Sequence, residues 1–257
     1  MMQKEKKWAA RAIPWAIPVL LVAVWQVLCT AGAIPVNILP SPVSVVKAGI
    51  GLAASGELAQ NIGISLYRAL MGFLIGGSIG FALGILNGIF KISDLLIDSS
   101  IQMLRNIPHL ALIPLVILWF GIDETSKIFL VALGVLFPVY INTYHGIKSV
   151  DKGLIEMGKA YGLNGMSLFF QVIFPGALSS ILVGIRYALG VMWTTLIVAE
   201  TIASNSGIGY MSMNAHEFMQ MDVIVLSIVI YAILGKVSDM VAKFFENKWL
   251  RWRKQTA

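Results

Sequence analysis

Six long apolar runs constrain this chain more than any other feature of its sequence. Each run is close to 20 residues long and carries few charges. An α-helix needs about 20 mostly apolar residues to cross the hydrocarbon core of a bilayer. We therefore expect an all-α integral membrane protein with about six transmembrane helices. The expected spans cover residues 13–32, 69–90, 99–121, 128–147, 176–199 and 223–241.

The composition argues against several other classes of protein. Of the 257 residues, 58% are hydrophobic and 12% are charged, whereas a soluble domain has about 45–50% apolar and about 25% charged residues. The net charge of +6 is grouped at the chain ends and in particular loops, which is typical of membrane topology and not of nucleic-acid binding. A single cysteine and three scattered histidines predict neither a disulfide nor a metal site. These residues are Cys29, His109, His145 and His216.

Basic residues orient the expected spans, because cytoplasmic loops of membrane proteins carry an excess of Lys and Arg. They gather before the first span, between the fourth and fifth spans, and after the sixth. We therefore expect both termini in the cytoplasm. No loop is long enough to hold a catalytic domain, so we expect no enzyme. The chain divides into a basic N-terminal segment (1–12), one membrane domain (13–245) with a cytoplasmic hairpin (149–175), and a basic tail (246–257).

The loops on the opposite side are poorer in basic residues and hold Lys47, Arg68 and Lys127. The first apolar run also has a competing interpretation as a cleaved signal sequence, because a basic start and an apolar run precede Ala31-Gly32-Ala33. Against cleavage, the uncharged stretch 12–46 is long and contains tryptophans that suit interfacial or packing anchors. We expect the segment to be retained as a span.

Glycines in the second expected span recur at every fourth residue. Steps of four keep them on one face of a helix with slow drift. Small residues let helix backbones approach closely in lipid, where no hydrophobic force drives helices together. We expect this stripe to pack tightly on a neighbouring helix. Its members are Gly72, Gly76, Gly80, Gly84 and Gly88.

Prolines and arginines mark the third and fifth spans. Pro108 and Pro114 each remove a helical hydrogen bond, so we expect the span 99–121 to be bent or partly broken. Arg105 lies near one end of that span, and Arg186 lies deep in the fifth, where a charge facing lipid costs at least roughly 2.5–3.5 kcal/mol. Two interpretations stay open. Either these arginines line a translocation path for an anion, or Arg105 snorkels to the surface and Arg186 pairs with a carboxylate or with backbone carbonyls.

The segment 151–175 is too charged to lie in the bilayer, because its charged side chains together would cost roughly 10 kcal/mol near mid-membrane. Its pattern predicts two short helices. The first is capped by Asp151 and ends just before Gly162, which suits the left-handed position past a helix end, and the second runs from about Ser167 to before Pro175. From these residues alone, a docking element and an interfacial loop without a partner stay open. One face of the first helix carries Leu154, Met157, Gly158 and Tyr161.

A resemblance separates these two interpretations. Glu156, Gly162 and the segment 172–175 resemble the E-A-A, G, I-x-L-P signature of ABC importer permeases, with Met157 and Gly158 in place of the two alanines. The stretch PHLALIPLVILWFGID resembles a segment shared by the nitrate, taurine and sulfonate branch of these permeases. With ASGEL, SIQMLRN, AETI, NSGIGYM and the tail WLRW, nearly the whole chain looks like the aliphatic-sulfonate permeases of that branch.

The resemblance implies the type I fold of ABC importer permeases in a multi-pass protein of the bacterial inner membrane. It implies a homodimer around one translocation path, two ATP-binding subunits, and a periplasmic solute-binding protein that delivers substrate to the loops 33–57 and 204–222. The chain has no G-x-x-x-x-G-K-[ST] phosphate loop, so ATP and Mg belong to the partner ATPase and this chain binds no cofactor. The implied ATPase-coupling residues are Leu154, Ile155, Glu156, Met157, Lys159, Ala160, Tyr161, Gly162 and Leu163.

The implied function is the permease subunit of an ATP-driven importer for aliphatic sulfonates. The alternative is the same machinery carrying taurine, nitrate or another small anion. An ion-coupled secondary transporter belongs to a different class and would be expected to show ionisable groups at mid-span and often an inverted repeat. Only Arg186 is clearly deep, and the two halves of the sequence do not match. A membrane enzyme would need clustered acid–base residues, for which His216, Glu217 and Asp222 are the nearest candidates.

Overall fold

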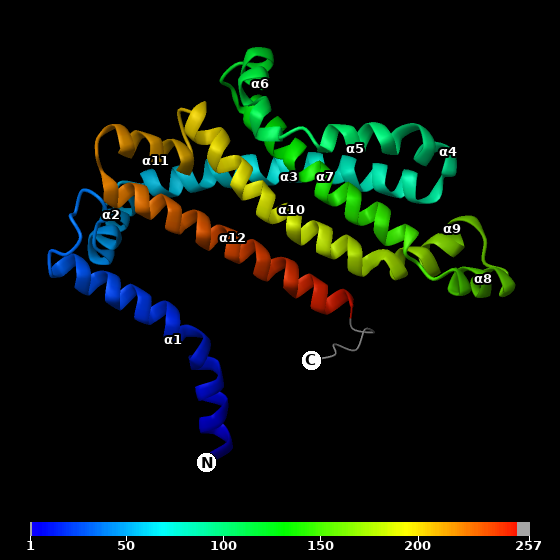
Figure 1. Cartoon of the computed structure of the whole chain (residues 1–257), viewed down its shortest axis with the longest axis horizontal. Coiled ribbons are helices and arrows are strands. Elements are labelled where there is room, and N and C mark those ends of the chain that lie inside the picture. The colour runs from blue at the N-terminus through cyan, green and yellow to red at the C-terminus, as the bar shows by residue number, and fades with distance from the viewer. Residues whose placement is uncertain (1, 251–257) are drawn as a thin grey trace.

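The computed structural model describes residues 2–250, with side chains from residue 16 onward. Within this part of the chain, helices follow one another without any strand, which confirms the predicted all-α class (Figure 1). Three segments, η1 (Asp94–Asp98), η2 (His109–Leu112) and η3 (Phe169–Ile173), are π-helical or 3₁₀ turns. The α-helices are α1 (Met2–Thr30), α2 (Pro42–Ala54), α3 (Glu57–Ile89), α4 (Lys91–Ser93), α5 (Ser99–Arg105), α6 (Ile113–Phe120), α7 (Glu124–Lys148), α8 (Lys152–Ala160), α9 (Gly165–Leu168), α10 (Phe174–Ile202), α11 (Ile208–Glu217) and α12 (Met221–Trp249).

Four helical segments within residues 16–250 are long and apolar enough to cross a membrane. They are α3, α7, the joined segment Gly165–Ile202 and α12, and a bent pair of helices counts as a fifth. These five match five of the six expected spans. The first expected span falls in α1, whose part with described side chains, Ala16–Thr30, is apolar but shorter.

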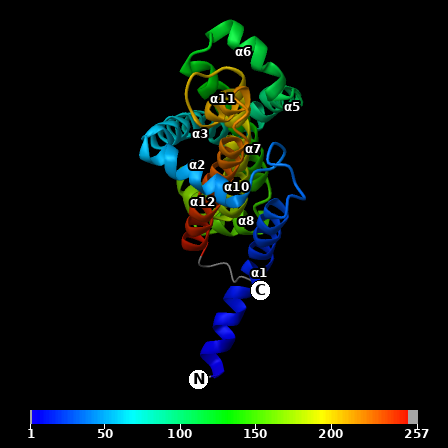
Figure 2. The ribbon, with the colours of Figure 1, turned by 90° about the vertical axis from the view of Figure 1, so that its left-hand side faces the viewer.

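α3, α7 and α12 run toward one end of the bundle and α10 runs back toward the other, so the bundle has two distinct ends (Figure 1). We call the end that carries α8 and α9 the hairpin end. The opposite end, which carries α2, α6 and α11, is the loop end. The main apolar core lies where α3, α7, α10 and α12 meet α11, and it includes Val135, Met192, Leu196 and Ile208. Figure 2 shows α1 extending away from these packed helices.

The glycine stripe of α3 packs on α7, as predicted. A Cβ atom added at Gly76 or Gly80 would collide with a backbone carbonyl of α7. At Gly84 the same atom would lie 2.7 Å from Cβ of Thr143, and at Gly88 it would lie 2.9 Å from Cβ of Ile147. Only glycine therefore permits the two backbones to approach this closely without a shift of one helix.

The third expected span is broken, as its prolines predict. The segments Lys91–Arg105 and His109–Phe120 meet at an angle of 79°. Pro108 lies in the break, where a proline disfavours helical backbone in the residue before it. Pro114 lies in the first turn of α6, where its missing N–H group costs no hydrogen bond.

Two tyrosines of α7 hold the first half of this broken span beside the bundle. The Tyr140 hydroxyl donates to Asp98 at 2.6 Å, and the Tyr144 hydroxyl donates to Asp94 at 2.8 Å. Lys148 Nζ also donates to Asp94 at 2.9 Å. The segment Lys91–Arg105 is thus fixed to α7 before the chain turns at Pro108.

The second predicted hairpin helix does not end before Pro175, so that boundary is wrong. The helix begins at Gly165, passes through the π-helical turn η3, and continues as α10 to Ile202. Proline is tolerated in this position because it falls at the start of the α10 hydrogen-bond pattern, after the wider π turn. The hairpin is therefore one short helix, α8, folded back on the beginning of a long one.

Candidate functional site

The first helix of the hairpin, α8, is defined by local hydrogen bonds at both ends. The Asp151 carboxylate accepts a hydrogen bond from Gly153 N at 2.7 Å, which confirms its predicted capping role. At the other end, Gly162 has φ +83°, a left-handed backbone that favours glycine. The turn returns the chain toward α9, and Leu163 N donates to the Gly158 carbonyl at 3.0 Å. The helix is therefore short because its sequence stops it on both sides.

One face of α8 packs against the second arm of the hairpin. Gly158 is buried, and a Cβ atom there would lie 2.8 Å from Leu168 Cδ1 and 3.2 Å from Val172 Cγ2. Ile155 is partly buried and joins an apolar cluster with Ile173. The sequence placed Gly158 on the same face as Leu154 and Tyr161, but Gly158 points into the hairpin. A small residue at this position lets the two arms close.

The other face of α8 leaves apolar side chains uncovered. Leu154, Met157 and Tyr161 are 47%, 50% and 81% exposed, and Met166 and Phe170 of the second arm are exposed as well. We call these five residues the hairpin patch. Apolar side chains concentrated on a protruding element are typical of a surface that contacts another protein. Around the patch, the predicted coupling residues Glu156, Lys159, Ala160 and Gly162 are also exposed.

Arg105 lies in a cleft beside the broken span. The cleft has a volume of about 280 Å³, and we call it the central cleft. Its walls come from the break after α5, from α7 and from α10. Arg105 is exposed here and forms no ion pair with any described carboxylate. Its lining residues are Arg105, His109, Gly134, Phe137, Pro138, Ile141, Asn142, Tyr187 and Val191.

Arg186 lies on a second, more open cleft of about 580 Å³. Its guanidinium donates to Asp239 of α12 and lies 3.8 Å from Glu246, so its charge is paired, as one of the two sequence interpretations expects. Tyr187 and Val191 line both clefts. The two predicted path arginines therefore lie on adjoining clefts, but only Arg186 is neutralised by neighbouring carboxylates.

A buried ionic cluster at the loop end was missed by the sequence analysis. Arg68, which we expected in a loop, lies inside α3 and is fully buried. Its guanidinium donates to the buried Glu200 carboxylate at 2.8 Å, to the Ser206 carbonyl at 2.7 Å, and to the carboxylate of Glu124. Arg68 thus joins α3 to α10, to the start of α7 and to the loop before α11.

Glu200 is the centre of this Arg68–Glu200 cluster. Its carboxylate accepts hydrogen bonds from Ser65 Oγ at 2.8 Å, from Tyr231 Oη at 2.9 Å and from Gly209 N at 2.9 Å. A Cβ atom at Gly207 would collide with the Glu200 carboxylate. The two glycines of NSGIGYM are therefore the sequence signal for a buried carboxylate at this point.

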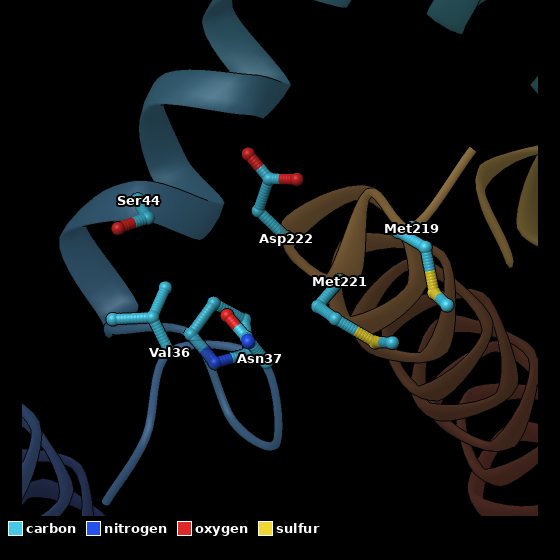
Figure 3. Close-up of a pocket in the computed structure, with 7 residues that line it drawn as sticks. Val36, Asn37, Ser44, Met219, Met221 and Asp222 are labelled. Carbon is cyan, nitrogen blue, oxygen red and sulfur yellow. The ribbon is translucent and has the colours of Figure 1, made fainter.

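The loop end also contains a pocket of about 580 Å³ (Figure 3). It lies between the two segments, 33–57 and 204–222, to which the family resemblance implies that a solute-binding protein delivers substrate. Figure 3 shows Ser44 on one side of the pocket and Asp222 and Met221 on the other. The lining residues are Val36, Asn37, Pro40, Ser44, Met219, Met221 and Asp222.

Sequence comparison identifies relatives along nearly the whole chain. A protein named as an aliphatic sulfonates transport permease from Escherichia coli (strain K12) is 61% identical over 252 residues, covering 98% of this chain and 96% of the relative. One of the same name from Bacillus subtilis (strain 168) is 46% identical and covers 92% and 86%. A taurine transport system permease protein from Escherichia coli (strain K12) is 33% identical and covers 91% and 86%.

Solved structures show the same fold at lower sequence identity. An amino acid ABC transporter chain superposes with a TM-score of 0.63 at 18% identity, over 80% of this chain and 97% of that chain. A methionine ABC transporter in an inward-facing conformation gives 0.58 at 17% identity, over 72% and 94%. Residues 72–251 match the family model for binding-protein-dependent transport system inner membrane components. The chain is thus a multi-pass permease that belongs to the family of inner membrane components of binding-protein-dependent ABC transport systems.

Proposed function

We propose that this chain is the membrane subunit of an ATP-driven importer for aliphatic sulfonates. The observation that supports this most strongly is the 61% identity to a protein named for aliphatic sulfonates transport, which extends over 98% of the chain. The 46% identity to a second protein of that name, from a different organism, supports the same substrate class. The taurine permease relative, at 33% identity, makes taurine the second candidate substrate.

The energy source in this proposal is a separate ATPase that docks on the hairpin end. The hairpin patch offers exposed apolar side chains on a protruding helix, and Glu156 and Lys159 add charged groups beside it. Two ATP-binding subunits, with their ATP and Mg, would close on nucleotide binding and move α8. This arrangement puts the hairpin end and both termini in the cytoplasm, in agreement with the basic residues near them.

Substrate would arrive at the loop end from a periplasmic solute-binding protein. The pocket between the segments 33–57 and 204–222 is a concave feature on the correct end of the bundle. Two copies of the permease would pack as a homodimer around one translocation path in the bacterial inner membrane, with lipid around the exposed apolar helices. Arg105 and Arg186 would line this path, because they lie on adjoining open clefts.

Transport by the reconstituted complex tests the proposed function. Proteoliposomes would contain the permease with its ATPase subunits, supplied with the solute-binding protein and ATP. We expect ATP-dependent uptake of radiolabelled ethanesulfonate, and no uptake when the ATPase subunits are omitted. Uptake driven by an ion gradient without the ATPase, or uptake restricted to taurine or nitrate, would contradict the assignment.

The role of Arg186 in the path has its own test. Arg186→Gln removes a positive charge from the cleft and leaves Asp239, which lines the cleft, with Lys236 as its remaining ion-pair partner. We expect slower uptake of an anionic substrate, because the local potential becomes less positive. Normal uptake together with normal stimulation of the ATPase would remove Arg186 from the path.

A further inference from the structure

The central cleft collects polar side chains from four separate elements. Arg105 ends α5, His109 begins η2, Asn142 lies on α7 and Tyr187 lies on α10. A guanidinium, an imidazole, a carboxamide and a phenol therefore line one cleft of about 280 Å³. Drug-sized ligands occupy pockets of roughly 300–1,000 Å³. The size of this cleft thus suits a smaller organic molecule.

The break in the third span brings two of these groups to the cleft. The 79° bend separates Arg105 from His109, so both ends of the break face the same space. Interrupted helices commonly form substrate sites in membrane transporters, because their ends carry unpaired polar groups near the middle of the membrane. An ionisable residue inside a span is expensive to bury and typically marks a functional site.

His109 is held in place by a dedicated arrangement on α7 and α10. Its Nε2 atom lies 2.9 Å from Thr195 Oγ1, at hydrogen-bond distance. A Cβ atom at Gly134 would lie 2.9 Å from that hydroxyl and 3.2 Å from Nε2, so glycine makes room for the pair. The other ring nitrogen, Nδ1, makes no hydrogen bond with the described residues. The imidazole is therefore fixed through one nitrogen and has the second available.

Arg105 differs from the other arginines of the bundle in the charge around it. Arg68 is bound by two carboxylates and Arg186 by Asp239. Arg105 has no such partner among the described side chains. The central cleft therefore has an uncompensated positive charge, and Tyr187 beside it is an exposed residue whose hydroxyl makes no hydrogen bond with the described residues.

We propose that the central cleft binds the sulfonate group of the transported molecule, with Arg105 as its ionic partner. This inference rests on the proposed function. A guanidinium presents several N–H donors in one plane and matches the oxygen atoms of an oxyanion in a bidentate manner. Tyr187 adds a hydroxyl and His109 its second ring nitrogen, and Asn142 adds the N–H that remains after its amide donates to the Pro138 carbonyl at 2.9 Å. The side chains of Phe137, Ile141 and Val191 form an apolar wall for the alkyl chain.

The test measures binding directly, without the delivery protein. The permease with its ATPase subunits is placed in nanodiscs, and the affinity for radiolabelled ethanesulfonate is measured by equilibrium binding. Arg105→Gln removes the ionic partner, Arg105→Lys keeps the charge without the planar fork, and Tyr187→Phe removes one hydroxyl. Lys91→Gln, which neutralises an exposed lysine of α4 outside the cleft, is the matched control.

We expect Arg105→Gln to raise the dissociation constant about tenfold or more, which is typical for loss of a hydrogen bond to a charged group. Arg105→Lys should recover part of the affinity, Tyr187→Phe should lose less, and Lys91→Gln should bind like the unaltered protein. A dissociation constant for Arg105→Gln within twofold of the unaltered protein would overturn the inference. The proposed function would still hold if the same protein imported ethanesulfonate with ATP.

A lipid phosphate presents the same anionic chemistry, so the binding is compared in two membranes. One set of nanodiscs contains phosphatidylcholine alone, and the other also contains phosphatidylglycerol. Ethanesulfonate binding that depends on Arg105 in both membranes supports a substrate subsite. Arg105-dependent retention of phosphatidylglycerol without any binding of ethanesulfonate would overturn it.

Discussion

Three arginines of the bundle illustrate how one residue type serves different purposes. Arg68 is sealed inside a network of carboxylates and hydroxyls, Arg186 is paired at the edge of a cleft, and Arg105 has no carboxylate partner among the described residues. A buried charge requires partners because removal from water costs several kcal/mol. The burial of Arg68 and the exposure of Arg105 therefore assign the first to stability and make the second available to a ligand.

The Arg68–Glu200 cluster predicts a large effect of a small substitution. Glu200→Gln keeps the shape of the side chain but removes the fully buried charge opposite Arg68. Breaking a buried ion pair from one side costs about 3–5 kcal/mol. We expect a clear fall in the thermal unfolding midpoint of the purified protein. Circular dichroism at increasing temperature measures it.

Glu124→Gln is the matched control for this substitution. Glu124 binds the same arginine, but half of its side chain is exposed to solvent, at 51%. Exposed ion pairs contribute only about 0–1 kcal/mol. The unfolding midpoint should therefore fall much less than in Glu200→Gln. Equal losses in the two variants would show that burial of Glu200 is not what makes the cluster stabilising.

The sequence could not reveal this cluster because its members are far apart along the chain. Arg68 and Glu200 are separated by 132 residues, and both border apolar runs. Without the fold, a charge beside an apolar run is most simply placed in a loop, which is where we expected Arg68. The glycines at 207 and 209 are required by the close approach of the Glu200 side chain. A glycine in a sequence does not by itself predict this, because a turn or a left-handed backbone also favours glycine.

At the scale of the helices, the contact between α3 and α7 predicts that Gly76→Ala is destabilising, and the neighbouring substitution Gly77→Ala is the control. A Cβ atom at Gly76 would collide with the backbone of Ala132, whereas at Gly77 it would lie 3.8 Å from a Val135 methyl group, an ordinary contact. Gly76→Ala should therefore separate the helices and lower the unfolding midpoint. Gly77→Ala should be neutral or slightly stabilising, because alanine favours helix by about 1 kcal/mol over glycine.

The outcome is measured as the unfolding midpoint and the membrane yield of each variant. If the two substitutions had the same effect, close backbone approach would not be the reason for the stripe. The glycine spacing was readable from sequence because it depends on helix geometry alone. Which helix receives the stripe was not readable, because every long span offered a suitable surface.

The ends of the helices were harder to predict than their centres. The structure begins α3 at Glu57, whereas apolar composition placed the span from residue 69 onward. The added turns contain Asn61, Ser65 and Arg68, whose polar groups bind partners from distant parts of the chain. A hydropathy pattern assigns these polar residues to a loop, because it takes no account of the hydrogen bonds that they form in the folded protein. The same limit applies at Pro175, where a π-helical turn accommodates the proline.

For the whole molecule, the hairpin predicts variants that insert into the membrane but neither bind the ATPase nor transport. Gly162→Pro imposes φ near −65° where the backbone has +83°, so α8 cannot close on α9. Glu156→Lys reverses a charge beside the hairpin patch. We expect both variants to reach the membrane but to lose association with the ATPase and sulfonate uptake. Pull-down of the ATPase and uptake in the same vesicles measure the two losses.

Lys91→Gln again serves as the control, because this exposed lysine is at the hairpin end but outside the hairpin. It should retain both association and uptake. Unchanged association and normal uptake in Gly162→Pro and Glu156→Lys would disprove the role of the hairpin. Loss of the permease from the membrane would instead identify a folding defect. Gly162→Ala strains the backbone less than Gly162→Pro, so a variant that inserts normally can then be tested for docking of the ATPase.

The uninterrupted run from Gly165 to Ile202 has a geometric consequence for the molecule. Its longest regular part is α10, whose 29 residues at 1.5 Å per residue make a helix about 44 Å long. A tilt of about 5° would displace one end of α10 by about 4 Å relative to the other. Glu200 fixes the loop end of α10 through its hydrogen bonds with Arg68 and Tyr231, so a tilt of α10 would pivot at this end. A tilt about this anchor would displace each residue in proportion to its distance from Glu200, so Tyr187 and Val191, which line the central cleft, would move less than the hairpin end of the helix.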